Sequence, residues 1–181
     1  MYIFTIERKG EVIVVHTARN VPRDLLRRWE EAMRLTGESM EYRALDIAKY
    51  IIKHEHDAGR QISNLRLQKL LYFAQAKFLI ETGKPCFSDP IMAWEFGPVV
   101  TSVYHEYKIF GGLDIFITPA CIELDKDTRE RIDNLLEFCV KIPTYKLVDI
   151  THSQAPWQNA RNNITSSEIT IDSIKQYFQK K

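Results

Sequence analysis

The densest group of metal-ligand side chains in this 181-residue sequence is the run His54, Glu55, His56 and Asp57. Imidazoles and carboxylates are the donors that hold zinc. On a helix, however, side chains two positions apart point about 200° away from each other, so His54 and His56 cannot share one ion without unwinding it. A histidine near a helix C-terminus is also favoured by the helix dipole. We therefore predict a solvated helix end and no metal site.

Two further groups resemble catalytic motifs without completing them. His105 and Glu106 would need a second histidine at position 109, which is Ile109, to form a zinc helix. His152 and Ser153 are adjacent in sequence, and adjacency is not the geometry of a catalytic triad. Neither group predicts an enzyme.

Gly97-Pro98 has neither the lysine nor the glycine spacing of a phosphate-binding loop. If it opens a helix, its free amides could donate to a carboxylate of a partner, and we keep this as an alternative. Cys86, beside a helix end, is a weak candidate for a reactive thiol. The sequence therefore predicts no catalytic residue, no cofactor and no metal.

Aromatic side chains at the ends of predicted elements are better candidates for function, because such residues anchor protein interfaces. Truncating a tryptophan anchor can cost about 2 kcal/mol or more of binding free energy. The same side chains are also explained by core packing, and Trp157 in particular could anchor the C-terminal segment. The candidates for contact with a protein partner are Trp29, Trp94, Phe96, Tyr104 and Trp157.

These aromatic residues must be positioned by a central helix predicted from Asn64 to Thr82. Ser63 and Asn64 are good N-cap types, and Gly83 with Pro85 ends the helix. A helix that is apolar on two faces is usually buried between two layers. The two stripes are Leu67, Leu70, Leu71, Ala74 and Phe78, and Leu65, Tyr72, Ala76 and Leu79.

The flanking elements are predicted more coarsely. Residues 89–95 suit a strand, and Gly97-Pro98 predicts the start of a helix over 98–110. Further helices are expected over 42–58, after the cap residue Asp125, and over 145–152. Residues 114–124 suggest an irregular or edge strand. We expect 153–161 to be loop and turn, and 166–178 to hold an extended piece and a helix.

Residues 1–41 form a separate addition in this prediction. Two segments of high β propensity flank Lys9 and Gly10 and indicate a hairpin. An amphipathic helix follows over 22–36 and ends at Gly37. The addition either docks on residues 42–181 or faces a partner. The predicted fold is α+β, mainly α: a helical bundle around a central buried helix, with a small β element and a β-β-α addition.

Composition limits the function classes. Twenty-five Lys and Arg against 24 Asp and Glu give a net charge of +1, so no global field favours nucleic acid. Cys86, Cys121 and Cys139 are odd in number and far apart, which fits a reducing cytoplasm. The longest apolar runs are far below the ~20 residues that span a bilayer, so we expect no membrane segment.

From Ile62 to Gly112 the chain reads ISNLRLQKLLYF, then Gly83, Pro85, Ala93 and Trp94, and then GPVV with Val103 and Tyr104. This string resembles the Panacea domain, the SocA-like antitoxin family. The resemblance extends to Ile174, Tyr177 and Phe178 and covers about residues 42–181. The residues that match the family motif and are given a structural role are Asn64, Gln68, Leu71, Gly97, Pro98, His152 and Pro156.

The resemblance implies an antitoxin that neutralises a cognate protein toxin by direct binding, without catalysis. It also leaves open a DNA-binding regulator of its own operon, and an adaptor that delivers the toxin to a protease. A protease or a second copy of the chain are further partners that the resemblance admits, and nucleic acid is admitted but not favoured. Residues 1–41 lie outside the resemblance, and we expect them to contribute to the choice of target.

Overall fold

A computed structural model describes residues 5–9, 12–16, 42–120 and 123–179. The chain divides into two compact units, Met1–Tyr42 and Arg43–Lys181. In the first unit, β1 (Thr5–Lys9) and β2 (Val12–His16) pair antiparallel. The predicted strands are therefore confirmed. The helix predicted over 22–36, and Trp29 within it, lie outside the described residues.

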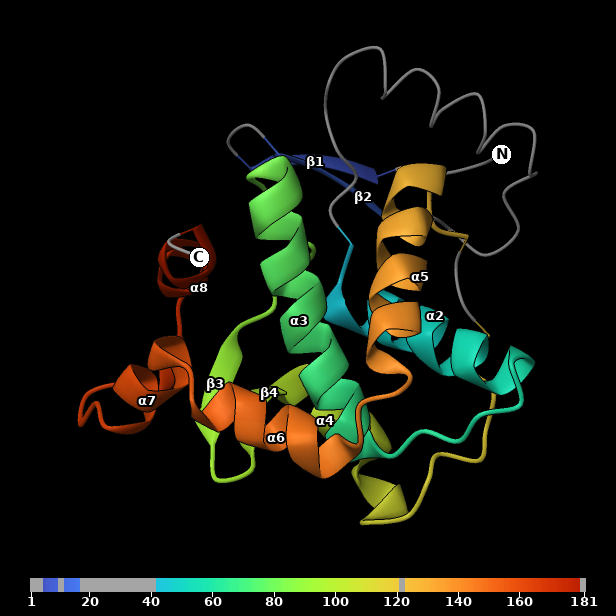
Figure 1. Cartoon of the computed structure of the whole chain (residues 1–181). Helices are drawn as coiled ribbons and strands as arrows, with labels where there is room; N and C mark the ends of the chain where they lie inside the picture. Colours follow the sequence, from blue (N-terminus) through green and yellow to red (C-terminus); the bar gives the residue numbers. More distant parts are fainter. Residues whose placement is uncertain (1–4, 10–11, 17–41, 121–122, 180–181) are drawn as a thin grey trace. The chain divides into compact units, whose positions relative to one another are not determined.

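The second unit is mainly helical and carries one small antiparallel sheet, as the sequence predicts (Figure 1). Its strands are β3 (Ile91–Trp94), β4 (Gly97–Val100) and β5 (Glu168–Ile169), in the order β4-β3-β5. A 3₁₀ turn, η1 (Lys108–Phe110), continues α4. The helices are α2 (Ala44–Asp57), α3 (Asn64–Thr82), α4 (Thr101–Tyr107), α5 (Lys126–Cys139), α6 (Thr144–His152), α7 (Ala155–Arg161) and α8 (Ile171–Gln179).

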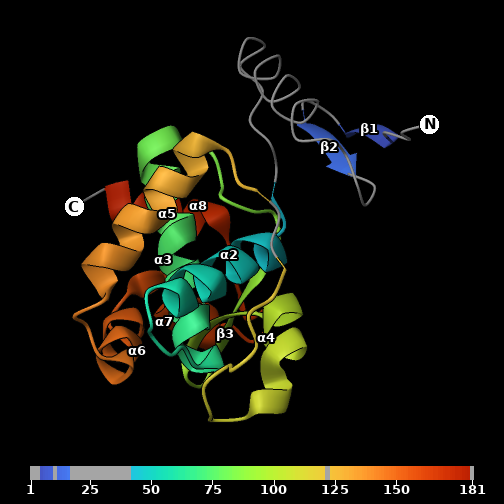
Figure 2. The same ribbon diagram turned by 90° about the vertical axis from the view of Figure 1, so that its right-hand side faces the viewer.

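Helix α3 is the centre of this unit. It packs against α2, α4, α5, α6, α8 and β4, and the turned view shows α2 and α5 in front of it (Figure 2). The Ser63 hydroxyl accepts the amide of Arg66 at 3.3 Å, and Gly83 stops the helix at φ 74°. Both predicted end signals are confirmed. Of the two predicted stripes, all members are buried except Leu65, which is exposed.

The prediction that a helix begins at Gly97-Pro98 is wrong. These residues belong to β4, where Gly97 pairs with Trp94 and Pro98 with Ala93, and the helix begins at Thr101. Gly97 has φ +100°, a conformation that glycine adopts without steric cost. β4 is an edge strand, and an edge strand tolerates a proline because one side of it has no ladder partner.

Two other expectations are corrected. Residues 153–161 are not only loop, because α7 begins at Ala155 with Pro156 in its first turn. In the first turn a backbone N–H has no partner within the helix, so the missing N–H of proline costs nothing there. The described part of 114–124 contains no strand; Asp114 makes a single bridge to Ser63. The capping role of Asp125 is confirmed, since its carboxylate accepts the amide of Thr128 at 3.0 Å. In the described part of the chain, no helix could cross a membrane.

Gln75 offers a test of how α3 holds its neighbours. Its side chain is fully buried, accepts the amides of Cys86 and Phe87 at 2.8 and 3.2 Å, and donates to the carbonyl of Phe87 at 3.0 Å. Gln75→Leu should lower the free energy of unfolding by about 3 kcal/mol or more, because each unpaired buried group costs about 1–3 kcal/mol.

Chemical denaturation measures this loss, and Gln176→Leu on the exposed face of α8 is the matched control. Equal midpoints for the two variants would contradict the role assigned to Gln75.

Candidate functional site

The structure brings four aromatic rings together where the β3–β4 hairpin meets α4, α6 and α7. We call Trp94, Tyr104, His152 and Trp157 the aromatic cluster. The rings of His152 and Trp157 stack at 4.1 Å and 23°, and Trp94 meets Tyr104 edge-on at 4.8 Å. The indole N–H of Trp157 donates to the carbonyl of Trp94 at 3.0 Å. The cluster therefore fastens α7 to the hairpin.

Phe96 lies at the turn of the hairpin and differs from the cluster. Its side chain is 62% exposed, whereas Trp94, Tyr104, His152 and Trp157 are all half-buried. Of the predicted contact residues that the structure describes, Phe96 is the one whose ring is free for a partner. The other three have internal ring contacts that a partner would have to share or displace.

Polar side chains of α3 form hydrogen bonds with the backbone of the hairpin. The amide of Val100 donates to Gln68 at 2.8 Å, and the carbonyl of Pro98 accepts from the Lys69 ammonium at 2.7 Å. Asn64 accepts from Gln68 at 3.1 Å and donates to the carbonyl of Tyr104 at 3.2 Å. These three α3 side chains are buried, so their bonds are shielded from water. They fix both β4 and the first turns of α4.

Gly97 sits tightly over this polar layer. A Cβ at Gly97 would lie 2.8 Å from both the Lys69 nitrogen and the Thr151 hydroxyl oxygen. Together with its φ of +100°, this excludes an unstrained side chain at position 97. The hairpin therefore lies directly against both Lys69 and the C-terminal turn of α6 at this position.

The residues predicted to have a structural motif role occupy the same region. Asn64, Gln68, Gly97 and Pro98 form the contacts above, and His152 belongs to the aromatic cluster. Leu71 is fully buried in α3, and Pro156 is buried in α7. The Nε2 atom of His152 is buried and has no hydrogen-bond partner among the described residues.

Two of the side chains that could bind a metal, His56 and Glu55, make hydrogen bonds to other groups of the protein. His56 contacts the carbonyl of Ile115 through Nε2 at 2.9 Å and the hydroxyl of Thr118 through Nδ1 at 2.7 Å. Glu55 is buried and accepts two N–H groups of Arg60 at 2.7 and 2.9 Å. Burial opposes ionisation, but Arg60 keeps the net pKa of Glu55 below its usual value. The described residues contain no group of three or more metal-ligating side chains.

The nucleophile candidates are similarly occupied. Cys86 is buried, and burial raises the pKa of its thiol far above the usual value, which disfavours the reactive thiolate. The hydroxyl of Ser153 donates to the carbonyl of Ile150 at 2.8 Å, while the imidazole of His152 stacks on Trp157. The region between the hairpin, α6 and α7 is therefore built as a packed scaffold with an exposed tip.

Residues 67–158 match the family model described as antitoxin SocA-like, Panacea domain. This interval contains the hairpin, the aromatic cluster and most of α3. The chain belongs to the SocA-like antitoxin family. A 144-residue match to Antitoxin SocA of Caulobacter vibrioides (strain NA1000 / CB15N) is 31% identical and covers 71% of this chain and 75% of that protein. No solved structure matches the chain.

Sequence reasoning missed Lys69 as a site residue. Lys69 entered only as a member of the segment ISNLRLQKLLYF, which carries the family resemblance. Its side chain is nevertheless fully buried against the hairpin. The available signal was its position between Gln68 and Leu70 on a helix predicted to be buried on two faces. A lysine inside such a helix must find a buried acceptor or remain neutral.

Lys69 predicts an unusual pH dependence of stability. Burial lowers the pKa of its ammonium from 10.5 to about 7, so between these values the unfolded chain binds the proton more tightly than the folded one. Stability should therefore rise with pH above about 7 through this group, by up to about 1.4 kcal/mol per pH unit.

The measurement is the difference in unfolding free energy between wild type and Lys69→Met at pH 6.5 to 8.5, below the range where thiols and phenols dominate. The unfolding free energy of wild type should increase relative to that of the variant as the pH rises. A difference that stays constant across this range would show that the folded ammonium keeps its ordinary pKa.

Proposed function

We propose that this protein is an antitoxin of a toxin–antitoxin system that neutralises a cognate protein toxin by direct, reversible contact. Membership of the SocA-like family supports an antitoxin role. Inhibition by contact needs complementary surface rather than a reacting group. The packed, internally hydrogen-bonded region around the hairpin is suited to that task because it presents surface side chains on a rigid base.

The observation that carries the proposed contact surface is Phe96. Its ring is exposed at the tip of a hairpin whose strands are fastened by Lys69 below and by Trp157 at the side. An aromatic side chain on a fixed backbone has only two torsion angles to order, so it loses little conformational entropy on binding. We place a toxin contact around Phe96, with Trp94, Tyr104 and Trp157 at its base. Trp29 is proposed as a separate toxin contact of the N-terminal unit. We place the complex in the cytoplasm.

The test begins with the gene beside the one for this chain. Expression of the neighbouring reading frame alone should arrest growth, and co-expression of this protein should restore it. The two proteins should also elute as one complex of defined stoichiometry when their mass is measured by light scattering. Normal growth with the neighbour alone, or arrest that persists with both, would contradict the proposal.

Substitution at the hairpin tip separates binding from folding. Phe96→Ser should weaken toxin binding by at least ~10-fold with an unchanged melting temperature, because the ring is exposed and interface anchors carry this much energy. Tyr145→Ser, at the start of α6 and also exposed, is the matched control and should bind as wild type does.

Trp157→Ala should behave differently from Phe96→Ser. It removes the indole bond to Trp94 and the stack on His152, so the melting temperature should fall by several degrees for a domain of this size. Calorimetry of both variants decides the matter. If Phe96→Ser also melts early, its ring belongs to the core and the contact surface lies elsewhere.

A further inference from the structure

Side chains of α3, rather than another strand, bind the outer edge of β4. In an antiparallel pair, residues alternate between those whose backbone groups face the partner strand and those whose groups face away. Two groups of β4 face away from β3, and we call them the outer edge: the carbonyl of Pro98 accepts from Lys69 at 2.7 Å, and the amide of Val100 donates to Gln68 at 2.8 Å. Two consecutive residues of α3 thus take the place of a neighbouring strand.

These two α3 side chains differ in their chemistry. Gln68 is neutral, and its amide group is paired with both Val100 and Asn64. Lys69 is fully buried, and the carbonyl of Pro98 is its one acceptor among the described residues. An ammonium has three N–H donors, so the charged form leaves two of them unpaired here. A buried charge and unpaired buried donors both cost free energy.

No opposite charge offsets this cost. β4 has no titratable side chain, and α6 contributes the hydroxyl of Thr151, which lies near the same point of the hairpin. The titratable neighbours of these groups along the chain are engaged elsewhere: Tyr72 donates to Gln154, and the ring of His152 stacks on Trp157. Burial alone lowers the pKa of the Lys69 amine, from 10.5 to about 7, so no described charged group acts on it.

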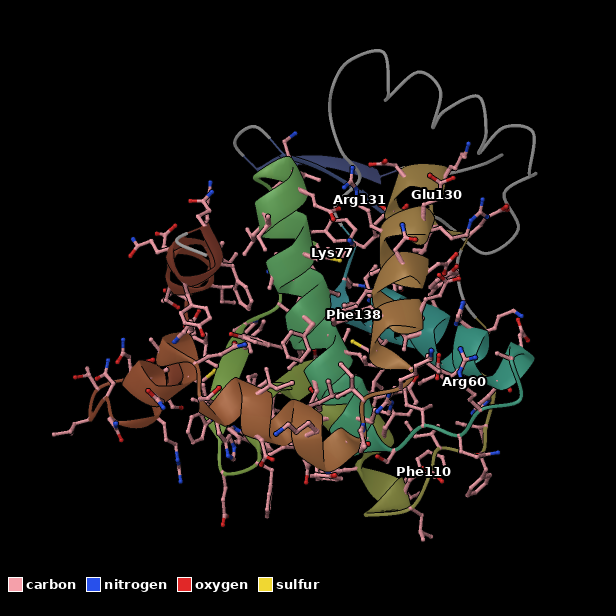
Figure 3. All side chains as sticks on the ribbon, in the orientation of Figure 1. Arg60, Lys77, Phe110, Glu130, Arg131 and Phe138 are labelled. Atoms are coloured by element: carbon pink, nitrogen blue, oxygen red, sulfur yellow. The ribbon has the colours of Figure 1, made fainter. Side chains whose placement is uncertain are left out.

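Lys77 shows the ordinary arrangement of a lysine on the same helix. It lies about two turns further along α3, is labelled in Figure 3, and forms an ion pair with Glu81 while 26% of its side chain stays exposed. Its charge is therefore met by a carboxylate and by water. Lys69 has neither while the outer edge is closed on α3, but release of the edge would admit water to its amine. Protonation of Lys69 therefore favours release.

Release of the outer edge would also move the turn of the hairpin. Phe96 lies two positions before Pro98, and Gly97 between them can change its backbone torsions at little steric cost. β3 has an attachment of its own, because the indole of Trp157 donates to the carbonyl of Trp94 at 3.0 Å. Release therefore shifts the exposed ring of Phe96 relative to the aromatic cluster beside it.

We propose that Lys69 is a positioning residue for the toxin contact, and that protonation of its amine releases the outer edge of β4 from α3 and weakens that contact. The inference rests on the proposed antitoxin function and adds control by pH to the surface around Phe96. A fall in pH would thereby loosen the hold of the antitoxin on its toxin.

The sign follows from the amine binding its proton less tightly in the closed form than in the released form. Between pH about 7 and 10.5, the ratio of closed to released protein should rise by about tenfold per pH unit. Below the lower of these values both forms are protonated, and the ratio no longer changes.

Hydrogen exchange of the free wild-type protein tests release directly. The amide of Val100 is buried, so it exchanges only when the edge is released or the chain unfolds. Exchange from an open form rises about tenfold per pH unit because hydroxide catalyses it, while the open fraction falls about tenfold. The Val100 rate should therefore stay nearly constant from pH 7.5 to 8.5. A rise of about tenfold would overturn the inference.

Urea separates release from global unfolding. The amide of Leu71, in the buried centre of α3, reports global unfolding, and its exchange should accelerate with urea. Val100 should exchange faster than Leu71 and respond little to dilute urea, because release exposes little surface. If the two amides share one rate and one urea dependence, Lys69 acts only on global stability and the inference is overturned.

Lys69→Met and Lys77→Met are matched variants, since each removes one amine from α3. Lys69→Met has no proton to gain, so its Val100 rate should regain the rise of about tenfold per pH unit. Lys77→Met should keep the wild-type profile. A flat profile in Lys69→Met would assign the pH effect to another group and overturn the inference. If Lys69→Met does not fold, the wild-type profile with urea decides.

The second measurement uses the growth-arresting product of the neighbouring reading frame as the toxin. A toxin that binds only the closed form loses affinity in proportion to the closed fraction. The ratio of its dissociation constants at pH 6.5 and 8.5 should be at least ~3-fold larger for wild type than for Lys69→Met. Equal ratios would overturn the link to the toxin.

Two further outcomes are distinguishable. If Lys69→Met does not fold, saturating toxin should slow the Val100 exchange of wild type at least ~10-fold, and an unchanged rate would overturn the link. If the neighbouring product neither binds nor is neutralised, the proposed function fails and the toxin link falls with it. The exchange profile of the free protein then still shows whether Lys69 releases the outer edge.

Discussion

The architecture depends on burying a helix that still carries polar side chains. Helix α3 is covered by neighbours on nearly every side, and an unpaired polar group in that position would cost about 1–3 kcal/mol. Each of its buried polar residues is therefore paired, and together they bond four neighbouring segments. Asn64 bonds α4, Gln68 and Lys69 bond β4, Tyr72 bonds Gln154 before α7, and Gln75 bonds the turn at Cys86 and Phe87. Pairing the helix thus fixes the register of the elements around it.

The hairpin shows how this constraint reaches the surface. Among the described residues, the Lys69 ammonium has no carboxylate partner and donates to the carbonyl of Pro98, so β4 must approach α3 closely. That approach leaves no room for a side chain at Gly97. The hairpin turn next to Gly97 then projects Phe96 outward. The buried amine of Lys69 and the absence of a Cβ at Gly97 therefore determine where the exposed ring of Phe96 lies.

Local signals predicted much of the fold, and long-range pairing limited the rest. Ser63 and Asp125 accept amides three residues further on, and Gly83 ends α3 through its own left-handed conformation; these caps and this stop are confirmed. Gly97-Pro98 could not be assigned locally, because proline suits both the first turn of a helix and an edge strand. The choice was made by Lys69, 29 positions away. Residues 114–124 were predicted to hold an irregular or edge strand for the same reason: Ile115 and Phe116 favour strands, but the described part of this range has no strand, and Asp114 makes a single bridge to Ser63.

The candidate site divides along the same line between scaffold and surface. Trp94 meets the ring of Tyr104 edge-on and its carbonyl accepts the indole N–H of Trp157, so changing these residues disturbs the base on which any contact rests. Phe96 is largely exposed, so its side chain can change at little cost in stability. A domain built in this way can retain its buried pairing while the exposed tips are altered to fit a different partner. Selectivity for the toxin is therefore expected to lie in the side chains that the fold uses least.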